Sequence, residues 1–427
     1  MKELQWFRFF SLPLISILQA GARPATVTSS KEANNSQTNR SVNATGLQYR
    51  DLSIVPPDTA RTPHSKLPNP FTFFNGRGVV TKDDWYLKRQ EISSSLQRLA
   101  LGELPVVVNT ADINATISSG GKTLTVSVRH NERSTSFSSL IEYPSGDGPF
   151  PAIIALGGSS IPTPSGVALI RFNNDEIGLQ VPHRSRGKFY DLYGHNHTAG
   201  IMNAWAWAVS RIIDGLVILP RALSKIDNTK LAVTGCSRNA KGALIAAAYD
   251  QRVALTITHD TGAGGTACWR ISEEMVRRGL EADNARKVVA SGPLFSTSFN
   301  QYVDDVDSLP FDHHFLPGLI APRGLLVLEN SGIPSLGPQS VYGCMVNGRK
   351  IFQALGVSDH MGISQVGNRD LCRFPQSQRR HLDAFVNKFL HRNIDVDTEI
   401  EYTDIGDDPV FNYTEGEWVD WSTPKLI

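Results

Sequence analysis

An excess of charge of either sign is missing from this 427-residue sequence. Its 42 Lys and Arg residues nearly balance 41 Asp and Glu residues, which leaves a formal net charge of +1. Without a strong field of one sign, neither nucleic acid nor an anionic membrane is expected as a partner. Charged residues make up only 19% of the chain and hydrophobic residues 41%, a composition typical of a globular protein and not of a disordered one.

Cysteines are few, and their spacing excludes the common zinc patterns, because no two are separated by two to four residues. No tight cluster of His, Asp and Cys ligands occurs in the sequence either, so we expect no metal site and no cofactor. An even number of cysteines in an oxidising compartment favours two disulfide bonds, with three connectivities open. The four residues are Cys236, Cys268, Cys344 and Cys372.

Long hydrophobic runs are also absent, apart from one near the N-terminus. Residues 9–18 are apolar, follow Lys2 and Arg8, and precede the small-residue triplet Ala20-Gly21-Ala22. A run of about ten residues is too short to span a bilayer and is typical of a signal peptide. Residues 1–22 are therefore predicted to be a secretion signal and the mature protein to be soluble and extracellular; an ordinary buried segment is the alternative.

Residues 23–57 are rich in Ser, Thr and Asn and poor in apolar residues. This composition predicts a disordered linker, followed by the globular domain over residues 58–427. Six N-x-S/T triplets in a secreted chain predict N-glycosylation. They begin at Asn34, Asn39, Asn43, Asn114, Asn196 and Asn412.

From Pro151 onward, apolar runs of strand length alternate with segments of helical periodicity. Repeated βα units with short connections predict a three-layer α/β fold with a mostly parallel sheet. The predicted strands are residues 152–156, 167–172, 231–234, 253–257 and 325–328, and the predicted helices are 202–216, 243–249 and 378–390.

The segment Gly235–Gly242 is a candidate nucleophile elbow, because it lies between a predicted strand and a predicted helix. In an elbow, a tight turn raises the serine hydroxyl above the edge of the sheet. Amides at the start of the helix can then bind a developing oxyanion. Asn239 replaces the usual second glycine, and Asn tolerates unusual backbone angles. Ser237 is therefore a candidate nucleophile, and an ordinary turn serine is the alternative.

Asp260 follows the next predicted strand, 253–257, at the start of a Gly-rich turn. A carboxylate at the C-terminal end of a parallel strand is well placed to orient a catalytic histidine. The alternative is that Asp260 only caps the turn.

Six strings, in order along the chain, resemble the glucuronoyl esterases of fungal wood degradation, and the resemblance extends from about Pro68 to Pro424. The resemblance implies a secreted serine esterase with a three-layer α/β-hydrolase-type fold. It also implies the substrate, an ester between 4-O-methyl-D-glucuronic acid of glucuronoxylan and lignin alcohols. The strings are Gly187–Gly194 (GKFYDLYG), Gly235–Ala243, Gly262–Ser272 (GAGGTACWRIS), Leu309–His314 (LPFDHH), Gly356–Gly362 (GVSDHMG) and Trp418–Pro424 (WVDWSTP).

The same resemblance implies roles for individual residues. Ser237 matches the nucleophile, Arg238 the arginine that stabilises the oxyanion, and Lys241 a lysine that contacts sugar hydroxyls. Asp260 stands where the family usually carries a glutamate as the acid. Disulfide bonds Cys236–Cys372 and Cys268–Cys344 are also implied.

The resemblance breaks at the general base, which in the family immediately precedes the cysteine bonded to the elbow. That position holds Leu371. A disulfide holds its two Cα atoms about 5–6 Å apart, so residue 371 is expected near Ser237, and leucine cannot accept a proton. In subtilisin, loss of the base lowers turnover by roughly 10⁶-fold.

Three further positions differ where the family contacts its sugar. Asp283, Ser291 and Ser335 align with a glutamine, a glutamate and a tryptophan of the family. Loss of the tryptophan at Ser335 removes an apolar surface for a sugar ring. A carboxylate at Asp283 would repel free glucuronate but not its neutral ester.

Among the histidines downstream of Ser237, His259 is the main candidate for a substitute base, because it neighbours Asp260. Adjacent side chains of a strand point to opposite sides, so both reaching Ser237 requires a turn. His313, His314 and His360 lie in shared strings and are expected to be structural. The remaining two, His381 and His391, are expected on a solvated face.

Two functions follow from these observations. The first is a secreted glucuronoyl esterase that uses Ser237 with Asp260. The second is a catalytically inactive relative that binds glucuronoxylan or another glycan. A monomer is expected, because glycans on the surface hinder close packing.

Overall fold

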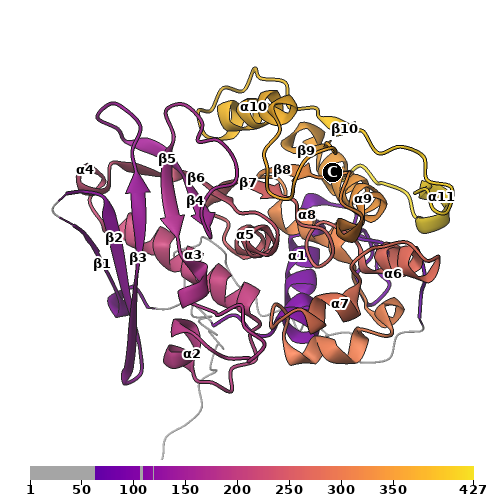
Figure 1. Ribbon diagram of the computed structural model, residues 1–427, viewed down its shortest axis with the longest axis horizontal. Helices are drawn as coiled ribbons and strands as arrows, with labels where there is room; N and C mark the ends of the chain where they lie inside the picture. Colours follow the sequence, from indigo (N-terminus) through magenta and orange to yellow (C-terminus); the bar gives the residue numbers. More distant parts are fainter. Residues whose placement is uncertain (1–62, 106–108, 119) are drawn as a thin grey trace, which may run out of the picture. The chain divides into compact units, whose positions relative to one another are not determined.

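The computed structural model describes residues 63–105, 109–118 and 120–427 (Figure 1). The predicted signal peptide 1–22 and linker 23–57 lie outside the described residues, as do Asn34, Asn39 and Asn43. Every described residue belongs to one compact unit, 43–427. The other three glycosylation candidates, Asn114, Asn196 and Asn412, are exposed.

A single sheet organises the described residues, with the strand order β1-β2-β3-β5-β4-β6-β7-β8-β9-β10 (Figure 1). The pairs β1–β2, β2–β3 and β3–β5 are antiparallel. All the remaining pairs in this order, from β5–β4 to β9–β10, are parallel. The prediction of a mostly parallel sheet is therefore confirmed. The strands are β1 (Ile113–Ile117), β2 (Thr123–His130), β3 (Arg133–Glu142), β4 (Phe150–Leu156), β5 (Ala168–Phe172), β6 (Ile226–Thr234), β7 (Val253–His259), β8 (Gly324–Glu329), β9 (Met361–Gln365) and β10 (Glu401–Thr403).

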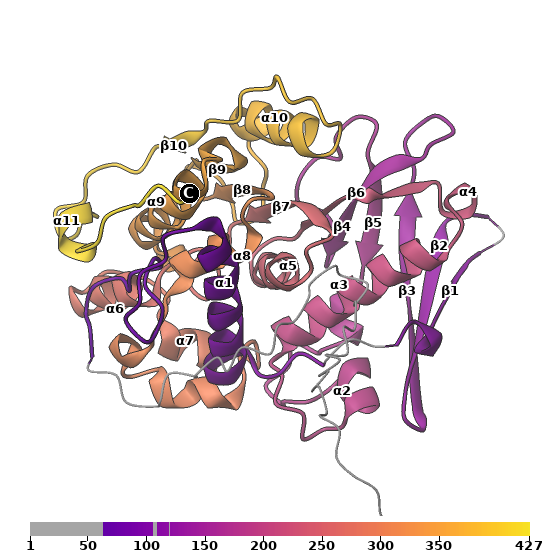
Figure 2. The ribbon, with the colours of Figure 1, turned by 180° about the vertical axis from the view of Figure 1, so that it is seen from behind.

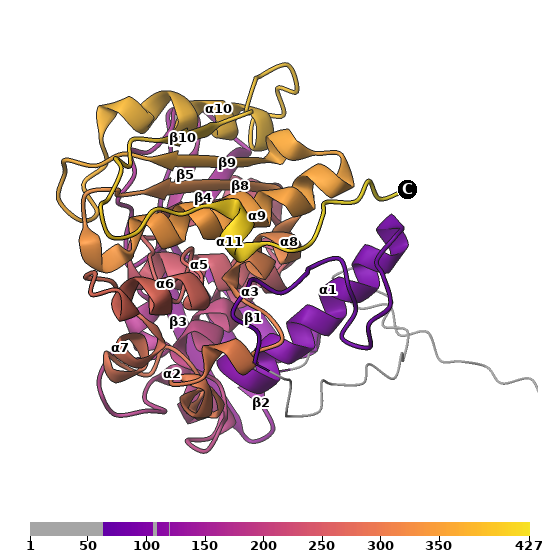
Figure 3. The same ribbon diagram turned by 90° about the vertical axis from the view of Figure 1, so that its right-hand side faces the viewer.

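Helices cover both faces of the sheet and complete three layers. On one face, α3 packs on β1, β2 and β6, and α5 packs on β4, β6 and β7 (Figure 2). On the other face, α10 packs on β7 and β8 (Figure 3). The helices are α1 (Lys82–Leu96), α2 (Lys188–Tyr193), α3 (Ile201–Ile218), α4 (Arg221–Ser224), α5 (Arg238–Tyr249), α6 (Trp269–Arg277), α7 (Ala285–Ala290), α8 (Leu316–Ile320), α9 (Pro338–Leu355), α10 (Arg379–Phe389) and α11 (Glu415–Trp418).

The alternation of side chains along β4 links its sequence to these layers. Ile153 and Ala155 belong to the core cluster that includes Phe385 of α10. Ile154 and Leu156 belong to the larger cluster on the opposite face. Successive side chains of a strand point to opposite faces, so a strand covered on both faces is apolar throughout, as the run in β4 is.

Helix α3 is long and apolar enough to cross a membrane by length and composition alone, but 78% of it is buried within the protein. Its contacts with the sheet make it a core helix. Helix α3 packs against α5, and α5 begins directly after the candidate nucleophile Ser237.

Every strand and helix predicted from residue 151 onward is present, with small shifts at the ends. Helix α5 begins at Arg238, earlier than expected, because the elbow leads directly into it. Strands β1 to β3 were not predicted, although Leu124, Val126 and Val128 alternate with polar residues along β2 and are buried. The expectation of a solvated His381 is wrong: it is only 7% exposed, and its Nδ1 lies 2.9 Å from Ser364 Oγ.

Candidate active site

Ser237 occupies a sharp turn between β6 and α5. Its backbone has φ 55° and ψ −123°, a conformation that non-glycine residues rarely adopt. The turn requires Gly235, since a Cβ there would lie 2.6 Å from the backbone carbon of Asn239. Because α5 begins at the next residue, the positive end of its dipole lies at the serine. This is the local geometry of a nucleophile elbow.

Asn239, which replaces the second elbow glycine, is accommodated by the end of β4. Gly157 leaves the room, because a Cβ on Gly157 would lie 2.0 Å from Asn239 Nδ2. The side chain is also held by Asn174, whose Nδ2 donates to Asn239 Oδ1 over 2.9 Å. The elbow therefore accommodates Asn239 without a clash, because Gly157 has no side chain.

Lys241 lies one turn into α5 and is 7% exposed. Burial lowers its pKa to about 8; the charge of Asp283 opposes this shift and that of Arg238 adds to it. Asp283 donates its backbone N–H to Ser335 O over 2.8 Å, so these two residues are neighbours. The cluster thus combines two cations and one carboxylate close to the elbow.

Ser291 is placed differently. It lies exposed at the C-terminal end of α7, where its hydroxyl donates to Val288 O over 2.8 Å. Among the described residues, no hydrogen bond joins Ser291 to Ser237, Lys241 or Asp283. Its predicted contact with a sugar stays a prediction.

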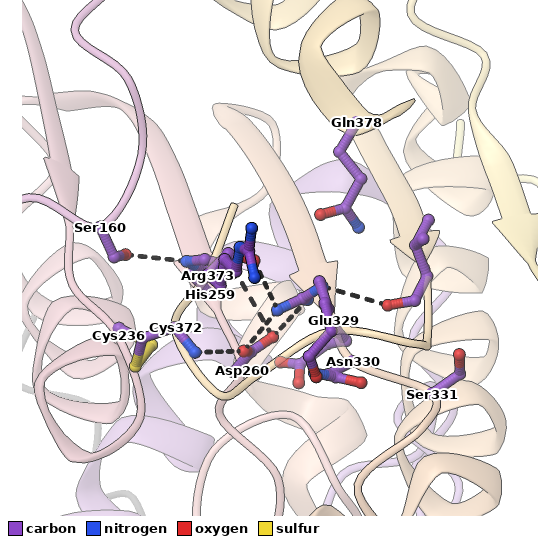
Figure 4. A network of polar contacts seen from close by, with 12 residues as sticks. Ser160, Cys236, His259, Asp260, Glu329, Asn330, Ser331, Cys372, Arg373 and Gln378 are labelled. Carbon is purple, nitrogen blue, oxygen red and sulfur yellow. Dashed lines mark hydrogen bonds and ion pairs between the residues drawn. A yellow bond between two sulfur atoms is a disulfide. The ribbon is translucent and has the colours of Figure 1, made fainter. Parts of the chain in front are cut away.

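Asp260 directly follows β7 and is completely buried. Its φ of 53° turns the chain, which is the turn that a joint approach with His259 requires. Arg369 binds the carboxylate with two hydrogen bonds, of 2.7 Å from Nη1 to Oδ2 and 2.6 Å from Nη2 to Oδ1. The backbone N–H of Cys372 donates to Oδ2 over 2.8 Å (Figure 4). Both oxygens of the Asp260 carboxylate therefore accept hydrogen bonds from the loop after β9.

Both disulfides implied by the resemblance are present, Cys236–Cys372 and Cys268–Cys344. The first bonds the elbow to the loop after β9, with 5.8 Å between the Cα atoms. Leu371 precedes this bridge and is 47% exposed. The side chain next to this disulfide is thus apolar, partly exposed to solvent and without a basic nitrogen.

His259 does not reach the elbow hydroxyl. Its Nδ1 lies 2.8 Å from Ser160 Oγ, and its Nε2 lies 3.7 Å from Asp260 Oδ1 (Figure 4). In the described part of the chain, no hydrogen bond joins Ser237 Oγ to a histidine. Burial lowers the pKa of His259 to about 4.

The three histidines expected to be structural are each bonded to the backbone. His313 Nδ1 lies 2.8 Å from Gly265 O, and His314 Nε2 lies 2.9 Å from Pro68 O. His360 Nδ1 lies 2.5 Å from Pro322 O. Among the described residues, none of these three rings forms a hydrogen bond with Ser237.

Three residues of this region were missed by sequence reasoning: Ser160, Glu329 and Arg369. Glu329 ends β8 fully buried, and burial raises its pKa to about 7, with the charge of Asp260 acting in the same direction. Its position at a strand end was a signal, as for Asp260. Arg369 and Ser160 carry no local signal, because their partners lie about a hundred residues away in sequence.

A metal centre has no support in the residues that the structure describes, which contain no group of three or more His, Cys, Asp and Glu side chains that could hold an ion. A serine at a strained strand-to-helix turn, with a carboxylate after the next parallel strand, defines a serine hydrolase of the α/β-hydrolase type.

Comparisons with known proteins identify the family. The model of "Glucuronyl esterase, fungi" matches residues 126–356, more than half of the chain. The 4-O-methyl-glucuronoyl methylesterase of Hypocrea jecorina is 48% identical over 385 residues, which cover 90% of this chain and 81% of that protein. The corresponding enzyme of Thermothelomyces thermophilus is 46% identical, covering 88% and 92%.

Similar solved structures identify the same family. The glucuronoyl esterase catalytic domain from Hypocrea jecorina matches with a TM-score of 0.82 and 48% identity, covering 87% of this chain and 99% of that one. A mutant glucuronoyl esterase from Sporotrichum thermophile, in complex with methyl 4-O-methyl-β-D-glucopyranuronate, also has a TM-score of 0.82, with 44% identity and coverage of 87% and 98%. The chain belongs to the fungal glucuronoyl esterases, which are carboxylic-ester hydrolases.

Proposed function

We propose that the protein is a secreted esterase that hydrolyses the ester between 4-O-methyl-D-glucuronic acid of glucuronoxylan and lignin alcohols, with Ser237 as nucleophile. The observation that carries this proposal is the strained backbone of Ser237 at the start of α5. The methyl 4-O-methyl-glucuronate bound by the Sporotrichum relative supports the choice of substrate.

The roles of neighbouring residues follow from their chemistry. Arg238 and the first amides of α5 supply positive charge where an oxyanion would develop. Lys241, with its ammonium group largely removed from water, donates to sugar hydroxyls. In this proposal Asp283, Ser335 and Ser291 contact the sugar, and Asp283 favours the neutral ester over the free acid.

Turnover by Ser237 is slow in this proposal. Leu371 occupies the position from which the family's base acts, and a serine hydroxyl without a base is a weak nucleophile. The elbow and the oxyanion donors alone still provide rate enhancement over water, of roughly 10³–10⁴-fold in serine proteases stripped of their triad.

A second candidate function is binding of glucuronoxylan or another glycan without turnover. The double hydrogen bond from Arg369 to Asp260 favours it, because the acid is already paired with a permanent cation. The fold and the charges at the elbow are compatible with ligand binding even where the chemistry is lost.

The deciding experiment measures hydrolysis of a methyl ester of 4-O-methyl-glucuronic acid by the full secreted chain. Slow turnover that Ser237→Ala abolishes supports the esterase. Binding of aldouronic xylo-oligosaccharides by calorimetry, with no turnover by wild type, supports the binding function. Neither turnover nor binding contradicts both. Secretion is tested in parallel by N-terminal sequencing of the exported chain, which is expected to begin at residue 23.

A further inference from the structure

A second serine lies beside a histidine and a carboxylate at the same edge of the sheet. Ser160 lies in the loop after β4, and its Oγ is 2.8 Å from Nδ1 of His259, the last residue of β7 (Figure 4). The other ring nitrogen, Nε2, is 3.7 Å from Asp260 Oδ1. The imidazole is completely buried, whereas Ser160 is half-buried.

The position of the ring proton follows from the two neighbours of the imidazole. His259 Nε2 has no hydrogen-bond partner among the described residues and faces the carboxylate. A proton on Nε2 is attracted to that carboxylate, whereas a lone pair there is repelled by it. The neutral ring therefore carries its proton on Nε2. The lone pair on Nδ1 accepts the hydrogen bond that the Ser160 hydroxyl donates.

We propose that Ser160 and His259 form a second nucleophile–base pair that acts on carboxylic esters, with Asp260 behind the imidazole. A hydroxyl in hydrogen-bond contact with a base, itself oriented by a third group, is the arrangement that activates a serine. Such constellations are recognised by geometry and not by position in the sequence.

The pair adjoins the elbow. The backbone N–H of Ser237 donates to the carbonyl of His259 over 2.9 Å. The loop that carries Ser160 begins at Gly157, which packs against the Asn239 side chain of the elbow. The backbones that carry the pair therefore adjoin the backbone of the elbow.

The reaction is an ordinary double displacement. The oxygen of Ser160 forms a bond to the ester carbonyl carbon while its proton passes to Nδ1 of His259. Collapse of the tetrahedral intermediate breaks the bond to the alcohol, which leaves with that proton. Water then attacks the acyl-serine and gives a proton to the imidazole, which returns it to Ser160 as the acid departs.

Arg369 makes His259 a weak base. It neutralises the Asp260 carboxylate that would otherwise stabilise an imidazolium. Phe374 also lies beside the His259 ring, with 6.1 Å between the two ring centroids. Burial, opposed by the charge of Asp260 and aided by that of Arg369, places the pKa of His259 at about 4. The imidazole is thus neutral at pH 7, with Nδ1 free to accept the Ser160 proton, but it accepts that proton inefficiently.

The test is covalent labelling of the full chain with a fluorophosphonate, followed by mass mapping of the modified peptide. The serine oxygen forms a bond to phosphorus as fluoride leaves, so the probe reports reactive serines without requiring the natural ester. We expect labelled Ser160 in wild type and in Ser237→Ala, no label at residue 160 in Ser160→Ala, and labelling slowed at least tenfold in His259→Gln. Ser159→Ala is the matched control, because Ser159 Oγ donates to Ile161 O over 2.7 Å and is expected to leave the rate unchanged.

The outcomes separate this pair from the proposed esterase site. Label on Ser237 alone supports the elbow nucleophile and overturns the pair, and label on neither serine overturns both. If His259→Gln does not fold, as judged by circular dichroism, the pH dependence of Ser160 labelling in Ser237→Ala replaces it. A rate that is constant above about pH 5 and falls toward pH 4 supports His259 as the base, and a rate that falls below about pH 7 overturns it.

Discussion

The hydrogen-bond partners of Asp260 limit its ability to orient a nearby histidine. Arg369 donates to both of its oxygens, and the N–H of Cys372 donates to one of them. An imidazole introduced beside the elbow would find the acid already paired with a permanent cation. The absence of a base at Leu371 is a prediction from the resemblance, and the pairing of Asp260 with Arg369 would be a second, separate obstacle to catalysis.

This leads to a prediction about paired substitutions. Leu371→His alone is expected to raise kcat/KM on the methyl glucuronate ester less than about tenfold, because the new imidazole is not oriented. Leu371→His with Arg369→Gln is expected to raise it by roughly 10²–10⁴-fold, the usual contribution of a general base. Arg369→Gln alone is the control and gains nothing. A full gain from Leu371→His alone would show that Asp260 is free to act.

Between elements, the contact of the β4 end with the first turn of α5 supports the elbow. Gly157 has φ 66° and lies against the Asn239 side chain, so it has neither the conformation nor the space for a larger residue. This contact compensates for the missing second glycine of the elbow.

Gly157→Ala is therefore expected to lower the free energy of unfolding by about 1–3 kcal/mol, the usual cost of overpacking. The measurement is denaturant unfolding followed by tryptophan fluorescence. Gly406→Ala is the control, because a Cβ there meets nothing within 4 Å. Equal unfolding curves for the two variants would contradict the packing of Asn239 against Gly157.

The strands and helices differed in how clearly the sequence predicted them. Strands β4 and β8 are almost continuous apolar runs and β5, β6 and β7 contain shorter ones, because helices bury both faces of the parallel sheet, and such runs are visible in sequence. Strands β1 to β3 have one polar face, so only an alternation of buried and exposed residues marks them in the sequence. Strands β4 to β8 and helices α3, α5 and α10 were therefore predicted, whereas β9, β10, α9 and the antiparallel edge were not.

For the whole molecule, buried titratable groups set the pH dependence of stability. Burial raises the pKa of Glu329 from 4.5 to about 7, and lowers that of His259 and His314 from 6.5 to about 4. Between pH 4.5 and 7 the folded state keeps a proton on Glu329 that the unfolded state releases, so stability falls as pH rises. Between pH 6.5 and 4 the unfolded state binds protons on the histidines that the folded state refuses, so stability falls as pH drops.

We accordingly expect maximal stability in mildly acidic solution, and Glu329→Gln to remove the loss on the alkaline side. One group contributes at most about 1.4 kcal/mol per pH unit. Thermal unfolding at pH 4 to 8 measures the slope, with the exposed Glu417→Gln as control. An unchanged slope from pH 5 to 7 in Glu329→Gln would contradict the buried proton.

The sequence by itself determined the parallel core, the elbow serine and the strand-end carboxylate, because short-range patterns of burial and turn chemistry encode them. With the resemblance it also indicated the two disulfides. Only the tertiary structure decided which partners the side chains have: Arg369 meets Asp260 across 109 residues and Ser160 meets His259 across 99. Such pairs arise where strand ends and loops converge on one edge of the sheet, and no local pattern records where a distant loop will place its side chains.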